Sequence, residues 1–223
     1  MRKFLTVMAA LMLAATGQSF AATFSYDLST EFSGGTDPVG PTPWVTVSFA
    51  DFAADTVRLT IDATGLSANE FFTEFDFNYL GGPALTSASF TNQTATTGTV
   101  ANPSIATGSN AFKADGDGFF DITFGFQTSA GSGRFGADDV WRVDIGGTGL
   151  SASMFNQQSF TGGDNGIWYV AAHVQGIGSA GGSGWIGGTP ANPIPEPEIY
   201  AMMAAGLGLM GFVARRRKQL AAA

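Results

Sequence analysis

The sequence predicts an all-β protein whose strands form an antiparallel two-sheet sandwich of the jelly-roll type. Apolar and polar residues alternate, which gives a strand one face for the core and one for solvent, in the segments 24–28, 45–49, 57–63, 71–79, 120–126 and 141–145. Clusters rich in glycine separate such segments, at 81–83, 131–133 and 162–166. No long segment of the middle carries a helical period, and half-buried strands of this kind pair into sheets that pack face to face.

The composition excludes several classes of protein. The chain has 223 residues, no cysteine, 31 glycines and a formal net charge of -8. Without cysteine, the chain has neither a disulfide scaffold nor a zinc site built on thiolates. Between residues 22 and 195, four Lys and Arg stand against sixteen Asp and Glu, and this balance of -12 repels phosphate backbones. We therefore expect no nucleic-acid partner.

Residues 1–21 have the pattern of a cleaved signal peptide. Arg2 and Lys3 give a basic start, 4–15 is an apolar run, and Ser19 and Ala21 are small residues at the cleavage positions. The basic, apolar and small-residue zones follow the order that export requires. This predicts export by a Sec-type route and a mature chain that begins near residue 22.

Residues 22–189 are predicted to form one β-sandwich domain with an internal repeat. Residues 57–71 align without gaps with 141–155, at an offset of 84 and with eight of fifteen positions identical. Each copy reads as a strand, a Thr-Gly turn and the motif Leu-Ser-Ala-x-x-Phe. Two copies are fewer than a solenoid needs, which favours pseudo-symmetric halves of one sandwich. We expect the following repeat residues to be buried: Leu66, Phe71, Leu150 and Phe155.

Asp115, Asp117 and Asp121 are candidate ligands of a calcium ion. They are carboxylates spaced by glycines that let the backbone curve around a hard cation. Phe119 and Phe120 occupy the fifth and sixth positions of the segment, which excludes an EF-hand loop. The alternative is a tight hairpin turn, because Asp-Gly pairs are favoured in such turns and a strand follows directly. The two interpretations are compatible, and the sequence indicates no other cofactor.

Two acid pairs are candidates for polysaccharide hydrolysis, Asp51 with Asp55 and Asp138 with Asp139. Glycoside hydrolysis needs two carboxyl groups held about 5 to 9.5 Å apart in a cleft. The alternative is that these acids are solvated turn residues at the starts of strands. His173 is the one histidine, so a catalytic triad would depend on it. Its apolar neighbours favour a packed strand residue instead.

Residues 175–188 include seven glycines, which predicts a long irregular surface loop or a sheet edge. Trp185 lies in this segment. An indole on such a loop can stack on a sugar ring, so Trp185 is a candidate glycan-binding residue. The alternative is that the ring covers one end of the sandwich.

The C-terminal end combines a stalk, an apolar helix and a basic cluster. The proline-rich stalk is 190–198, the uncharged segment 199–214 predicts a transmembrane helix, and 215–223 is the predicted cytoplasmic tail. Sixteen helical residues span about 24 Å, short of the roughly 30 Å hydrocarbon core, so the span would be thin. Basic residues after the span keep the tail inside the cell and place the domain outside. They are Arg215, Arg216, Arg217 and Lys218.

This order of Pro-Glu-Pro, short apolar helix and arginine cluster resembles the C-terminal sorting signal of PEP-CTERM proteins of Gram-negative bacteria. The resemblance implies an exosortase, a membrane protease or transpeptidase, as processing partner, and it makes Pro195, Glu196 and Pro197 the recognition element. It also implies a precursor anchored transiently in the inner membrane and a product at the cell surface or in the extracellular matrix. The alternative is a permanent single-span anchor.

A second resemblance lies in the domain. Phe49, Asp51 and Ala53 resemble the Phe-x-Asp-x-Ala signature of one branch of PEP-CTERM proteins, as do residues 171–178 and 184–187. The branch implies little about activity.

Three hypotheses of function follow. The first is a non-catalytic exported surface or matrix protein that binds exopolysaccharide or another glycan weakly, as in a biofilm. The second is an envelope polysaccharide hydrolase that uses an Asp pair. The third is a passive tethered domain without a ligand.

Overall fold

The computed structural model describes residues 22–163, 166–191, 206–207 and 210. The predicted signal peptide (1–21), the Pro195–Pro197 motif and the basic cluster at 215–218 lie outside these residues. The same holds for most of the predicted span 199–214, of which only residues 206, 207 and 210 are described, as helical. Within the described ranges, no helix has the length and apolar character needed to cross a membrane.

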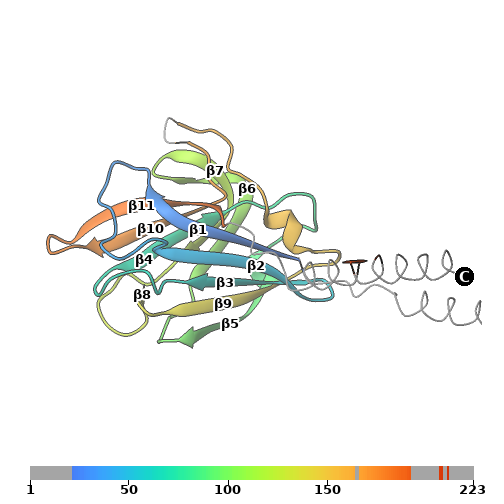
Figure 1. The fold of residues 1–223 in the computed structure, drawn as a ribbon, viewed down its shortest axis with the longest axis horizontal. Coiled ribbons are helices and arrows are strands. Elements are labelled where there is room, and N and C mark those ends of the chain that lie inside the picture. The colour runs from blue at the N-terminus through green and yellow to red at the C-terminus, as the bar shows by residue number, and fades with distance from the viewer. Residues whose placement is uncertain (1–21, 164–165, 192–205, 208–209, 211–223) are drawn as a thin grey trace, which may run out of the picture. The chain divides into compact units, whose positions relative to one another are not determined.

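Strands dominate the described residues (Figure 1). The strands are β1 Thr23–Glu31, β2 Val45–Ala53, β3 Thr56–Asp62, β4 Phe71–Phe77, β5 Phe90–Thr97, β6 Ser104–Ala114, β7 Asp117–Gly125, β8 Phe135–Gly136, β9 Val140–Gly146, β10 Val170–Ile177 and β11 Gly182–Pro190. Two short 3-10 helices accompany them, η1 Ser87–Ser89 and η2 Ala152–Phe155. The alternating segments of the sequence thus form strands, as predicted.

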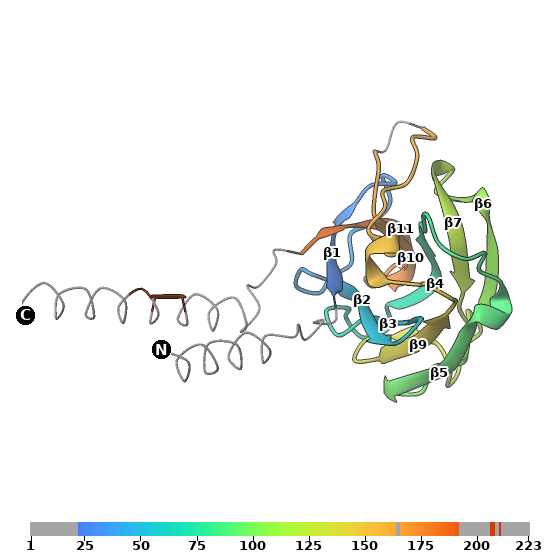
Figure 2. The ribbon, with the colours of Figure 1, turned by 90° about the vertical axis from the view of Figure 1, so that its right-hand side faces the viewer.

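The strands form one continuous sheet in the order β5-β9-β3-β2-β1-β11-β10-β4-β7-β6, with β8 paired to β4. Every pair of neighbouring strands is antiparallel. The sheet curls into a half-barrel (Figure 2). The predicted all-β antiparallel class is confirmed, with the difference that one curled sheet supplies the two walls we assigned to separate sheets.

Aromatic side chains fill the concave side of this sheet. Phe124 of β7 and Trp141 of β9 are fully buried, and their rings meet edge to face with centroids 5.7 Å apart. β7 and β9 are distant in the sheet order, so the curl brings the walls face to face around these rings. On the same side, Phe49 of β2 stacks on Phe155 of η2 at 4.8 Å. Both arrangements are favourable for aromatic pairs.

The two repeat copies lie next to each other in the sheet. β3 and β9 pair antiparallel with Leu59 opposite Val143. A local two-fold axis perpendicular to the sheet at this pair therefore relates each residue of β3 to the one 84 positions later in the chain. We expected the copies in the two halves of a sandwich, whereas they are neighbouring strands of one wall.

The turns that follow the two strands have the same hydrogen bonds. Leu66 N–H donates to the Ala63 carbonyl at 3.0 Å, and the equivalent Leu150 N–H donates to the Gly147 carbonyl at 2.9 Å. The four repeat residues expected in the core are buried: Leu66, Phe71, Leu150 and Phe155. The sequence repeat is therefore one strand-and-turn unit used twice.

The glycine-rich segment 175–188 was predicted as a loop or a sheet edge, and this prediction is wrong. The segment forms most of the β10–β11 hairpin, and β11 lies inside the sheet between β1 and β10. A Cβ on Gly187 would lie 2.2 Å from the Trp168 ring, and one on Gly188 would lie 2.3 Å from Val170. Here glycine makes room for close packing rather than for flexibility.

Candidate binding site

A polar pocket of about 490 Å³ lies on the convex, outer face of the sheet over β2, β3, β9 and β5. It is lined by Phe52, Arg58, Asn92, Gln93, Thr94, Arg142 and Asp144. This group combines two guanidinium groups, one carboxylate, two amides and an aromatic ring. We call it the outer pocket.

Strand alternation places the charged residues of the outer pocket. In β3 and β9, apolar residues such as Leu59 and Val143 are buried in the core. Arg58, Arg142 and Asp144 lie at the intervening positions and therefore project from the opposite face. Arg58 and Arg142 are equivalent residues of the two repeat copies, so the local two-fold axis brings both cations to one place.

A β-bulge places the amides. β5 departs from regular register between Thr91 and Thr94, and Asn92 has a positive φ of 52°. Bulges of this kind redirect side chains, and here Asn92 and Gln93 both line the pocket. Asn92 Nδ2 donates to Asp144 Oδ2 at 3.0 Å.

The negative charge of Asp144 is balanced by an ion pair with Arg58. Arg58 Nε donates to Asp144 Oδ1 at 2.7 Å, and a terminal nitrogen of Arg58 donates to Oδ2 at 3.1 Å. Hydrogen bonds from Arg58 lower the pKa of Asp144, with a further lowering from Asn92 and from the charges of Arg58 and Arg142. Burial opposes this lowering. Asp144 is therefore an ionised carboxylate held in a bidentate ion pair, which is the strong geometry for this pair.

Two groups of the outer pocket have unused bonding capacity. Among the described residues, the Arg142 guanidinium has no hydrogen-bond or ion-pair partner, although it lies close enough to Asp144 to affect its pKa. Gln93 Oε1 is buried and accepts no hydrogen bond from a described residue. A buried acceptor without a donor costs about 1 to 3 kcal/mol.

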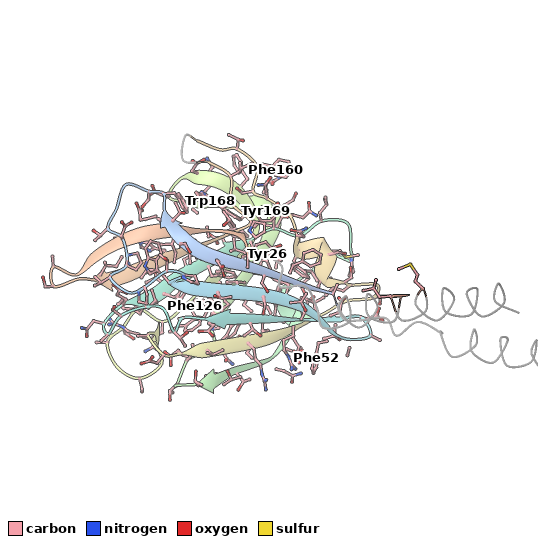
Figure 3. The ribbon with its side chains drawn as sticks, in the orientation of Figure 1. Tyr26, Phe52, Phe126, Phe160, Trp168 and Tyr169 are labelled. Atoms are coloured by element: carbon pink, nitrogen blue, oxygen red, sulfur yellow. The ribbon has the colours of Figure 1, made fainter. Side chains whose placement is uncertain are left out.

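Phe52 gives the outer pocket an accessible aromatic ring. The Arg58 guanidinium lies 3.3 Å from the ring centroid, yet Phe52 remains 52% exposed. Figure 3 shows Phe52 at the periphery of the domain, apart from the buried rings around Tyr26. The outer pocket thus offers a ring face beside donors and acceptors.

Trp185, the predicted glycan-binding residue, lies elsewhere. It belongs to β11, is 9% exposed and stacks on His173 at 5.0 Å. It packs in a small outer cluster with Ala114, Phe120 and Ala171. The indole is therefore packed and has no open face for a sugar.

The aspartates proposed as calcium ligands form a hairpin turn or accept hydrogen bonds from backbone N–H groups. Asp115 and Gly116 form the two-residue turn between β6 and β7, both with positive φ, at 52° and 72°. This is the twist that Asp-Gly hairpin turns favour. Asp117 Oδ1 accepts the N–H of Gly118 at 2.7 Å, and Asp121 accepts the N–H groups of Asn110 and Tyr79 at 2.7 and 3.2 Å. No group of three or more His, Cys, Asp or Glu in the described residues is placed to hold a metal ion.

The acid pairs proposed for hydrolysis also cap backbone groups. Asp51 accepts the N–H of Ala152 at 2.7 Å and that of Ala22 at 3.1 Å. Asp55 Oδ1 accepts the N–H of Gly149 at 2.7 Å. In the same way, Asp139 Oδ2 accepts the N–H of Gly136 at 2.9 Å. These bonds give the carboxylates the turn role that we stated as the alternative to catalysis.

His173 is a packed residue of β10, as expected. Its Nδ1 lies 2.7 Å from Thr73 Oγ1, and burial lowers its pKa, with an opposing effect of Asp115. Neither residue lines the outer pocket or the second pocket, of about 480 Å³. That second pocket is formed around Tyr79, Leu85 and Asp121.

Sequence reasoning missed the outer pocket. Arg58 and Arg142 are two of the four Lys and Arg between residues 22 and 195 and occupy matching repeat positions, but nothing in the repeat indicates that the copies pair with each other. Asn92 and Gln93 reach the pocket through a bulge, which leaves no periodic signal. The one available signal was the repeat itself, since a paired repeat places its two arginines on the same face.

Comparison with known proteins identifies the C-terminal segment. Residues 193–218 match the family model of the PEP-CTERM protein-sorting motif. Comparisons with curated proteins and with solved structures found no match. The domain and the motif together define an all-β exported protein that is handled at the membrane by an exosortase. The chain carries a PEP-CTERM protein-sorting motif at residues 193–218.

The matched segment includes Pro195, Glu196 and Pro197 and ends at Lys218, so it covers the three parts of the predicted sorting signal. It does not extend to residues 49–53. Membership of the Phe-x-Asp-x-Ala branch therefore stays a prediction.

Proposed function

We propose that this protein is a non-catalytic component of the cell surface or extracellular matrix, and that it binds a glycan weakly through the outer pocket. The observation that carries the proposal is the accessible ring of Phe52 next to unsatisfied polar groups. Sugars present an apolar face that stacks on an aromatic ring and hydroxyls that exchange hydrogen bonds with amides and charged side chains. The sorting motif supports a location where such polymers occur.

The carboxylates support binding rather than hydrolysis. Asp144 is the one acid that lines the outer pocket, and Arg58 occupies both of its oxygens. A glycosidase needs a second carboxyl group about 5 to 9.5 Å away. None of the acids considered from the sequence lines this pocket, and Asp51, Asp55 and Asp139 accept backbone N–H groups.

A glycan array with the full-length protein tests the proposal. We expect binding to a subset of glycans, lost in Phe52→Ala and kept in Phe160→Ala. Phe160 is the matched control because it is an exposed phenylalanine, at 63%, outside the outer pocket (Figure 3). An array without any signal above background, or binding that survives Phe52→Ala, would overturn the assignment of the site.

The alternative hypothesis of a hydrolase is tested on the same glycans. We expect no release of reducing ends from any polymer that the protein binds. Steady release that is lost on Asp51→Asn or Asp139→Asn would replace the binding role with catalysis.

A further inference from the structure

The charge of the outer pocket differs from that of the rest of the domain. Of the four Lys and Arg between residues 22 and 195, two line this pocket. The other two are placed elsewhere: Lys113 lies 4.5 Å from the Phe119 ring centroid, and Arg134 lies 3.9 Å from that of Phe71. Arg134 also donates to the Thr128 carbonyl. Arg142 is thus the cation without a partner among the described residues.

The outer pocket therefore carries one unit of positive charge in excess. Arg58 and Asp144 cancel each other through their bidentate ion pair, which leaves the guanidinium of Arg142. A half-buried cation that lines a pocket and has no partner in the described part of the chain is an unusual feature, because long cationic side chains readily reach solvent or an acid. Its five donors form a planar fork that matches a carboxylate in bidentate fashion.

From this charge balance we infer that the outer pocket binds an acidic sugar, a uronic acid unit of a polysaccharide, with its carboxylate on Arg142. The inference rests on the proposed glycan-binding function and specifies its ligand class. In this arrangement the sugar ring lies against Phe52, and the carboxylate accepts hydrogen bonds from Arg142. One excess charge suits a singly charged sugar. Polyphosphates and nucleic acids meet the strongly negative surroundings and are repelled.

Two ligands that differ by one charge give the test, methyl galacturonoside and its methyl ester. The ester keeps the sugar ring and its hydroxyls and removes the single negative charge. Isothermal titration calorimetry with the full-length protein should show at least about tenfold tighter binding of the acid, the size expected for one charge-assisted pair. Arg142→Gln should remove this preference and leave weak binding of both ligands. Arg134→Gln is the matched control, because it deletes a cation outside the pocket, and it should keep the preference.

The outcomes separate the inference from the proposed function. Equal affinity of the wild-type protein for acid and ester, both lost in Phe52→Ala, would overturn the acidic-sugar inference and keep glycan binding. A preference for the acid that persists in Arg142→Gln would also overturn it. If neither ligand binds but the array shows binding to neutral glycans, the acidic-sugar inference is wrong and the proposed glycan binding stands. An array without any binding contradicts both. If Arg142→Gln folds poorly, the comparison of acid and ester on the wild-type protein still tests the acidic-sugar inference.

Discussion

Asp76 is a carboxyl group buried without a charge partner. It lies in β4 at 0% exposure, on the outer face, next to Glu74 and Thr123. Neither of its oxygens has a hydrogen-bond partner in the described residues. Burial raises the pKa of Asp76 to about 8, Glu74 adds to the rise and the Thr123 hydroxyl opposes it. Asp76 is therefore protonated in the folded protein at neutral pH.

This protonation makes stability depend on pH. An unfolded chain releases the Asp76 proton near 3.8, whereas the folded protein keeps it up to about 8. Between these values the unfolded state binds fewer protons, so the free energy of unfolding falls as pH rises. Urea unfolding from pH 4 to 8 should show a steeper fall for the wild type than for Asp76→Asn.

Below about pH 3.8 both proteins carry no charge at this position, so the comparison there is the internal control. Parallel stability profiles over the whole range would contradict an unpartnered acid at Asp76. The groups that face it, Glu74 on the same strand and Thr123 on β7, are unchanged in both proteins.

At the level of elements, the positions of the strands were predicted well from the sequence, and the pairing between strands was predicted poorly. Alternation placed β2, β3 and β9 because each has one buried face. The repeat predicted matching turns and a buried Phe155 correctly. The pairing of β3 with β9 could not be predicted from the sequence. The same repeat results whether its two copies are neighbouring strands of one wall or lie in opposite walls.

The β10–β11 hairpin was missed for a different physical reason. A glycine in the sequence does not indicate whether it provides backbone flexibility or space for a neighbouring side chain. In β11 it provides space, because the Trp168 ring lies against Gly187 and Val170 lies against Gly188. The outer pocket was missed together with the pairing, because its arginines converge only in the assembled sheet.

This explanation of β11 predicts a large effect of one methyl group. In Gly187→Ala, the added Cβ would meet the Trp168 ring at 2.2 Å, and the ring or the strand must move. We expect a loss of roughly 1 to 3 kcal/mol, typical of overpacking, with a shift in tryptophan fluorescence. Thermal and urea unfolding measure the change.

The matched control is Gly146→Ala at the end of β9, where the nearest atom to an added Cβ is 3.9 Å away. It should stay close to wild-type stability. Equal effects of the two substitutions would show that glycine in β11 is not required for packing.

At the level of the whole molecule, the chain combines an acidic all-β domain with a C-terminal sorting motif. Residues 22–195 have a formal charge balance of -12, which predicts repulsion of phosphate backbones. The segment 193–218 provides the signal by which an exosortase handles the protein at the membrane.

The central claim is tested most directly by mass spectrometry of the protein from its native host. Envelope and medium fractions are digested and searched for peptides from both ends of the chain. The account predicts a product that begins near Ala22 and contains no peptide from 202–213. Recovery of the protein only as an inner-membrane species with 202–213 intact would contradict it and leave a permanent anchor.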